Sequence, residues 1–158
     1  MMHESSGASV ALLRYHDFVP KPYIAFGEKL LRNGVDARDV ASATVAALDA
    51  AAAGRFGLFR TIVHTNHSMP PEVVQDFRGQ GAAWCERQVP GAGALMEKYR
   101  ISLPERVEQH DLSEAKEKMG WAPSVGFADF LRDLKARDAR GDDVRALWAP
   151  GYLPLVQE

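Results

Sequence analysis

The sequence is poor in cysteine, and its charges of the two signs nearly balance. Cys85 is the one cysteine among 158 residues, which excludes an internal disulfide framework and a cysteine-rich zinc site and is typical of a reducing compartment. Nineteen lysines and arginines against 21 aspartates and glutamates give a formal net charge of -2. The low cysteine content predicts a cytoplasmic protein. Because so small a net charge creates no field that attracts polyanions, we also expect that the protein binds neither nucleic acid nor membranes.

Long hydrophobic runs are also missing. The longest weakly polar stretch, residues 40–53, is interrupted by Ser42, Thr44 and Asp49, and it is too short and too polar to span a bilayer. Residues 1–8 are polar and lack the basic flank and apolar run of a signal peptide, so we expect a flexible N-terminal arm there. The sequence therefore predicts a soluble protein.

A glycine-rich turn that could cradle a dinucleotide is the third absence. Such a turn follows a strand and opens a helix, so that backbone N–H groups reach the pyrophosphate. The glycine pairs in residues 79–84 and 91–96 are followed by a bulky residue, and the pair in residues 54–57 links a helix to a strand, which is the reverse order. We therefore expect this chain alone to bind no dinucleotide cofactor.

The hydrophobic pattern that is present predicts a single α/β domain over residues 9–141. Short apolar or β-branched runs predict strands, and apolar residues at helical spacing predict helices. The predicted strands are residues 9–14 and 57–64, and the predicted helices are residues 40–48, 73–84, 92–99, 114–119 and 127–139. The remaining predictions are a loop over residues 15–33 with at most one short turn, a short extended segment at 106–110 and an irregular tail at 142–158.

Capping residues mark the ends of several predicted helices. Asp39 suits the N-cap of the first long helix, and Asp36 suits the turn that precedes it. Gly54, Gly120 and Gly141 suit helix C-termini, where a left-handed backbone is common. We interpret the two aspartates as structural, although a carboxylate pair in a dry cleft is also suited to acid–base catalysis.

Three stretches in the chain carry a resemblance to a known family. They are VALLRYHDFVP at residues 10–20, GVDARDVASA at residues 34–43 and DLSEAKEKMGWAP at residues 111–123. In this order they resemble the C-terminal, substrate-lobe part of the extended short-chain dehydrogenase/reductase family, the NAD-dependent nucleotide-sugar epimerases and dehydratases. The resemblance covers about residues 9–138. It implies a partial Rossmann-like parallel sheet of few strands with a helical substrate lobe.

The resemblance also implies machinery that this chain lacks. A complete family member binds NAD(P) and uses a tyrosine with a lysine four residues later, because the ammonium group lowers the pKa of the phenol that takes the proton. None of the four tyrosines has such a lysine, because the fourth residue after Tyr15, Tyr23, Tyr99 and Tyr152 is Val19, Gly27, Leu103 and Val156, respectively. We therefore predict no catalytic residue in this chain.

Two residues are predicted to contact a substrate on the basis of the resemblance. His16 lies at the mouth of the loop after the first strand, where family members contact cofactor and sugar. Arg106 lies where family members place an arginine on the substrate diphosphate, for which a planar guanidinium group is well suited. A solvated surface arginine is the alternative interpretation of Arg106.

Other reactive side chains have simpler interpretations. His64 and His67 lie three residues apart at the end of the second predicted strand and, with Asp36 or Asp39 nearby, can be imagined as metal ligands. Their three-residue spacing turns them to different sides and no third ligand is specified, so we interpret them as surface or hydrogen-bonded histidines and predict no metal site. We interpret Cys85 as a small buried hydrophobe rather than a nucleophile.

The main functional hypothesis is a truncated epimerase/dehydratase-like protein that retains the sugar-nucleotide lobe. It would act with a partner chain or as a ligand-binding subunit, and its strand at residues 9–14 would leave an open sheet edge. We therefore expect a homo-oligomer or a complex with a complementary N-terminal-half protein. The alternatives are a non-catalytic assembly module and a small enzyme with unrelated acid–base chemistry at His16, Asp36 or His64.

Overall fold

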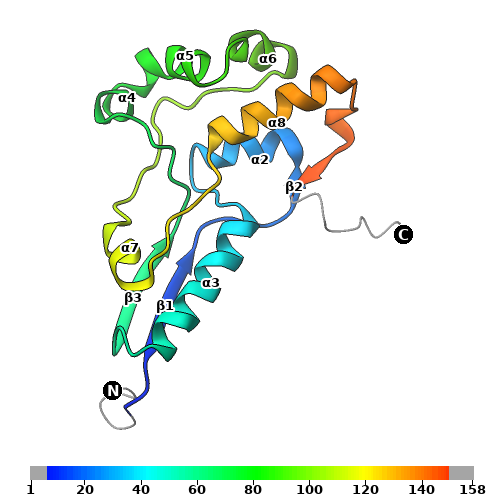
Figure 1. The fold of residues 1–158 in the computed structure, drawn as a ribbon. Helices are drawn as coiled ribbons and strands as arrows, with labels where there is room; N and C mark the ends of the chain where they lie inside the picture. Colours follow the sequence, from blue (N-terminus) through cyan, green and yellow to red (C-terminus); the bar gives the residue numbers. More distant parts are fainter. Residues whose placement is uncertain (1–6, 150–158) are drawn as a thin grey trace.

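The computed structural model describes residues 7–149, and a two-stranded parallel sheet lies in its lower half (Figure 1). Strand β1 (Val10–Tyr15) pairs in parallel with β3 (Leu58–Val63), and helix α3 (Ala37–Ala52) lies between them in the sequence. Both strands begin and end within one residue of the predicted bounds, so the prediction of an α/β chain with a small parallel sheet is confirmed. The predicted N-terminal arm lies outside the described residues except for residues 7 and 8.

One face of this sheet packs against α3 and forms a small core. The buried residues of this core are Val35, Ala43, Ala47, Ala50, Phe59, Val63, Leu112, Ala115, Met119 and Trp121, and Leu13 of β1 packs against them. Side chains alternate along a strand, so Leu12 and Leu58 point to the opposite face. They are 55% and 61% exposed, respectively. Within residues 7–149, the opposite face of the sheet is therefore not fully covered.

Helix α3 begins three residues earlier than predicted, which changes the roles of Asp36 and Asp39. Asp36 is the N-cap residue, and its side chain accepts a hydrogen bond from the Arg38 backbone N–H. The prediction that Asp39 caps the helix is wrong. Asp39 lies in the first turn, is 1% exposed, and accepts hydrogen bonds from the backbone N–H groups of Ser124 and Val125 and from the Ser124 hydroxyl. Its carboxylate thus joins α3 to the segment that precedes the last long helix.

The predicted loop over residues 15–33 is wrong in its second half, which contains β2 (Lys21–Pro22) and α2 (Tyr23–Leu30). Pro22 directly precedes the helix, where its missing N–H costs nothing. Gly27 lies inside the helix because the Phe130 ring packs against it, and a Cβ there would lie 2.3 Å from ring atoms. Both residues resemble breakers in the sequence but serve the helix.

Five helices pack around a larger core in the upper half of the molecule (Figure 1). They are α2, α4 (Pro71–Gln75), α5 (Phe77–Gln88), α6 (Ala92–Tyr99) and α8 (Phe127–Arg140). Helix α6 has the predicted bounds and α8 is one residue longer than predicted, whereas the helix expected over residues 73–84 is two helices. Among residues 7–149, no helix combines the length and apolar character that a membrane crossing requires.

The tail differs from the prediction, whereas the extended segment predicted at residues 106–110 belongs to no helix or strand. Residues 106–110 lead into α7 (Ser113–Met119), which packs into the small core. After α8, the short 3-10 helix η1 (Val144–Ala146) is followed by β4 (Trp148–Ala149), which pairs antiparallel with β2. The tail is therefore ordered as far as residue 149, and the rest of the predicted tail lies outside the described residues.

Candidate functional site

Two histidines directly follow the two parallel strands. His16 comes after β1 and His64 after β3, and the His16 backbone N–H donates to the Val63 carbonyl at 3.1 Å, which extends the strand pairing by one step. The carboxyl ends of parallel strands lie at the same edge of a sheet, where ligands bind in open α/β folds. Strand pairing therefore brings the two imidazoles together, with their ring centroids 4.5 Å apart.

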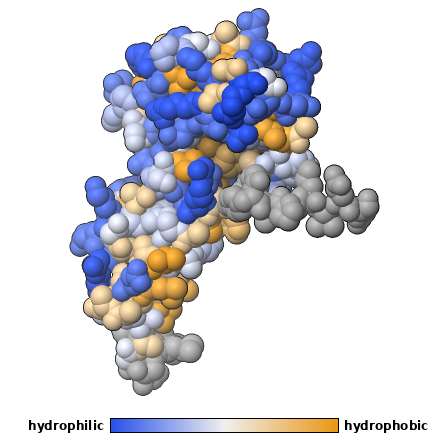
Figure 2. All heavy atoms as spheres, turned by 45° about the vertical axis from the view of Figure 1, so that its right-hand side comes forward, coloured by the Kyte–Doolittle hydropathy of each residue, from blue (hydrophilic) through white to orange (hydrophobic). Residues whose placement is uncertain are grey.

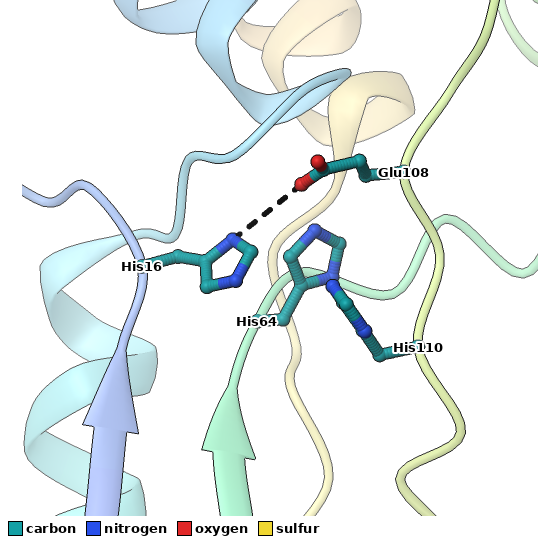
Figure 3. Close-up of side chains that lie close together, drawn as sticks. All are labelled: His16, His64, Glu108 and His110. Atoms are coloured by element: carbon teal, nitrogen blue, oxygen red, sulfur yellow. Dashed lines mark ion pairs between the residues drawn. The ribbon is translucent and has the colours of Figure 1, made fainter.

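The irregular segment between α6 and α7 adds two further side chains. Glu108 and His110 project from this segment toward His16 and His64 (Figure 3). The His110 ring centroid lies 5.3 Å from that of His16 and 4.8 Å from that of His64, and a Glu108 carboxylate oxygen lies 3.9 Å from His16 Nδ1. We call these four residues the histidine cluster. It joins three parts of the chain that are far apart in the sequence.

Burial keeps the inner imidazoles of the histidine cluster uncharged. His64 is fully buried, and burial lowers its pKa to about 4, with smaller contributions from the neighbouring rings of His16 and His110. Burial and His110 also lower the pKa of His16, although Glu108 partly opposes this effect. At neutral pH both rings are therefore neutral, and each has one nitrogen with a free lone pair.

The hydrogen bonds of the cluster leave two ring nitrogens unpaired. His64 Nε2 lies 3.3 Å from the Arg32 carbonyl oxygen, so this nitrogen carries the proton and donates it. Within residues 7–149, neither His64 Nδ1 nor His16 Nδ1 has a hydrogen-bond partner, although both atoms are buried. Buried polar atoms without a partner are uncommon in folded proteins and call for an explanation.

A surface cleft gives access to one side of the cluster. It has a volume of ≈600 Å³ and is lined by His110 together with polar side chains that include Asn66, Gln109 and Lys116. His110 and Glu108 are themselves exposed, whereas His64 is buried behind them. A small polar ligand or an ion can therefore reach the cluster from solvent.

The structure brings together only part of the predicted site. His16 belongs to the histidine cluster, whereas Arg106 is exposed two residues before Glu108 and is not a member of it. His67 points away, as predicted, because its Nδ1 accepts a hydrogen bond from the Phe127 N–H at 3.5 Å. His64 and His67 both form hydrogen bonds, as expected from the sequence. The position of His64 beside His16, Glu108 and His110 was not predicted.

The remaining candidates have structural surroundings. Asp36 accepts hydrogen bonds from Nε and Nη2 of Arg38 as well as from its backbone N–H, and neither Asp36 nor Asp39 belongs to the histidine cluster. Cys85 is fully buried, and burial raises its pKa to about 12, so it carries no thiolate at neutral pH. The interpretation of Cys85 as a buried hydrophobe therefore agrees with its surroundings.

Comparisons of the chain with known protein families, with curated proteins and with solved structures found no match.

Proposed function

We propose that this chain is the substrate-lobe part of an epimerase/dehydratase-like assembly, which binds a nucleotide sugar while another polypeptide completes its sheet. The observation that carries the proposal is the outer edge of β1, which pairs with no strand among residues 7–149 and which we call its open edge. A hollow of ≈800 Å³ lies beside it, with Leu13 of β1 and Ala47 and Leu48 of α3 among its lining residues. Parallel sheets are almost always covered on both faces, so a sheet of two parallel strands is an incomplete unit.

Exposed apolar side chains support a missing partner at this edge. Leu12 is 55% exposed and Leu48 is 66% exposed, and both line the hollow. Figure 2 shows hydrophobic residues gathered on the lower half of the molecule, where β1 and α3 lie. Full burial of an exposed leucine contributes about 1.5–3 kcal/mol, and covering the part of each side chain that is still exposed would gain a share of this, so an added strand and its helix would gain burial here. We infer that a second copy or a complementary chain supplies them.

Contacts between the resembling stretches support the family assignment within this proposal. The helix entry at residues 34–43 and the Gly-Trp-x-Pro turn at residues 120–123 lie against each other, because the Trp121 indole donates to the Ser42 hydroxyl at 3.0 Å. Asp39, in the first of these stretches, also binds the backbone directly after the turn. The two stretches therefore pack against each other, which is expected of motifs that occur together in one fold.

The substrate would bind at the carboxyl edge of the sheet, beside His16 and the cleft that His110 lines. Arg106 is exposed on the irregular segment between α6 and α7, which also carries His110. Its guanidinium group can form two parallel hydrogen bonds with a diphosphate. The residues of this chain would bind and orient the nucleotide sugar. Hydride transfer would require NAD(P) and a tyrosine–lysine pair from the partner. A non-catalytic assembly module is the second candidate, favoured by the same apolar hollow.

Calorimetric titration of the purified chain with UDP-sugars, TDP-sugars and NAD tests this proposal. We expect a sugar nucleotide to bind and NAD to give no binding heat. Arg106→Ala should weaken sugar-nucleotide binding about tenfold or more, because a charge-assisted hydrogen bond contributes about 1.5–3 kcal/mol. Arg132→Ala, which removes an exposed arginine on α8, should leave the affinity unchanged and serves as the control.

The other outcomes of this titration separate the candidates. Binding of neither ligand class would favour the assembly module over the substrate lobe. Tight binding of NAD by the isolated chain would contradict the proposal.

A further inference from the structure

We propose that His16, His64, Glu108 and His110 bind one divalent transition-metal ion of the zinc class. One potential ligand atom from each of these residues lies within 4.8 Å of the others. Bonds from zinc to nitrogen or oxygen are about 2.0–2.2 Å long, so four tetrahedral ligand atoms lie about 3.4 Å apart, and each atom needs to move by less than about 1 Å. This inference is independent of the nucleotide-sugar proposal.

The unpaired ring nitrogens are the second observation that points to a ligand. Nδ1 of His16 and Nδ1 of His64 are buried and have no hydrogen-bond partner within residues 7–149, and both residues belong to the histidine cluster. A metal ion accepts lone pairs, so it would satisfy both atoms at once. A hydrogen-bonded role of the kind seen for His67 does not account for them.

The surroundings of His64 resemble those of a metal-ligating histidine. Its Nε2 faces the Arg32 carbonyl oxygen at 3.3 Å, which fixes the proton on that nitrogen and leaves Nδ1 for the metal. Histidines that bind metals commonly donate their other N–H to a carbonyl or carboxylate, because this orients the ring and raises its basicity. The backbone of the turn that follows α2 would therefore act as the outer partner of this ligand.

The donor set selects the class of metal. Three imidazoles and one carboxylate, without a thiolate, suit zinc, cobalt or nickel better than calcium or magnesium, which prefer oxygen ligands. The carboxylate would offset one of the two positive charges of a divalent cation, and the three neutral rings would offset none. Such a net positive charge is common in zinc sites with histidine ligands. Four protein ligands fill a tetrahedral sphere, so we assign the site a structural role.

The place of the site in the fold indicates what the metal would do. His16 and His64 are held by paired strands, whereas Glu108 and His110 belong to the irregular segment between α6 and α7. Near the cluster, the Glu108 backbone N–H donates a long hydrogen bond to the Leu31 carbonyl at 3.4 Å. A bound ion would tie this segment to the carboxyl edge of the sheet. Because a ligand that binds only the folded state stabilises it, the metal should also raise the melting temperature.

The experiment is titration of the metal-free, tag-free full chain with Co²⁺ and Zn²⁺. Calorimetry should give a stoichiometry of one ion per chain, and Co²⁺ should give the intense visible absorption of four-coordinate cobalt. The variants His110→Gln and Glu108→Gln should each weaken zinc binding by about 100-fold or more, because loss of a direct ligand should cost at least as much as the 10–100-fold loss seen for outer partners. Both side chains are exposed, so neither change should prevent folding.

His67→Gln is the matched control, because it removes a histidine outside the cluster and should leave the zinc affinity unchanged. The proposal is overturned if the wild-type chain binds neither ion. It is equally overturned if His110→Gln and Glu108→Gln bind zinc as tightly as the wild type, or if His67→Gln alone weakens binding.

Discussion

Replacing Asp39 with alanine should lower the free energy of unfolding by about 3–5 kcal/mol. The Asp39 carboxylate is 1% exposed and accepts three hydrogen bonds, from the Ser124 N–H, the Ser124 hydroxyl and the Val125 N–H. Alanine leaves these donors without a partner, and an unsatisfied buried donor costs about 1–3 kcal/mol. Because domains are stable by only about 5–15 kcal/mol, this loss is a large share of the total.

Urea denaturation followed by circular dichroism measures the effect of this substitution. Asp49→Ala is the matched control, because it is the same change at an exposed position of the same helix, and it should alter the free energy of unfolding by less than about 0.5 kcal/mol. If Asp39→Ala were as stable as Asp49→Ala, the hydrogen bonds between α3 and the segment before α8 would not hold the two together.

Acidification from pH 6.5 to pH 4 should destabilise the protein, partly through His67. Burial is the main cause that lowers the pKa of His67 to about 4 from the ordinary value of 6.5. As the pH falls, the unfolded chain therefore takes up a proton on His67 at a higher pH than the folded chain does. The contribution of His67 to the free energy of unfolding is complete above pH 6.5 and is lost as the pH falls toward 4. A shift of this size corresponds to a contribution on the order of 3 kcal/mol.

His67→Gln isolates this contribution, because glutamine does not titrate and its side-chain oxygen can still accept from the Phe127 N–H. Denaturation curves at pH 7 and pH 4 should show a smaller loss of stability for the variant than for the wild type, by roughly 2–3 kcal/mol. Equal losses in the two proteins would mean that the pKa of His67 is nearly the same in the folded and unfolded states.

Elements with a strong local pattern could be predicted from the sequence. The strand at residues 9–14 and the helix at residues 92–99 have continuous apolar or periodic patterns and clear breakers at their ends, so their places follow from local chemistry. The loop prediction is wrong at α2 because Gly27 is needed there to make room for the Phe130 ring. Phe130 lies more than 100 residues later in the sequence. Asp39 was mistaken for a cap because its partners, Ser124 and Val125, lie 85 and 86 residues later in the sequence.

The candidate site could be predicted only in part for the same reason. His16 lies just after the first predicted strand and His64 at the end of the second, so the pairing of two parallel strands is enough to bring them together. Nothing local indicated Glu108 and His110, because their contribution depends on the path of an irregular segment across the sheet edge. Sequence spacing finds ligands that lie on one element, and this cluster takes its members from three parts of the chain.

The most direct test of the central claim, that another polypeptide covers the open edge of β1, is sedimentation velocity of the purified chain. We expect the wild type to sediment as a species larger than its 17.4 kDa monomer, because a second copy can pair along this edge. The double variant Leu12→Lys, Leu48→Lys should be monomeric, since two charges in the hollow oppose burial. Val19→Lys, an exposed apolar position outside the hollow, should associate like the wild type. A double variant that associates as strongly as the wild type would contradict the account, and a wild-type chain that stays monomeric at high concentration would exclude a second copy at this edge and leave a complementary chain as the partner.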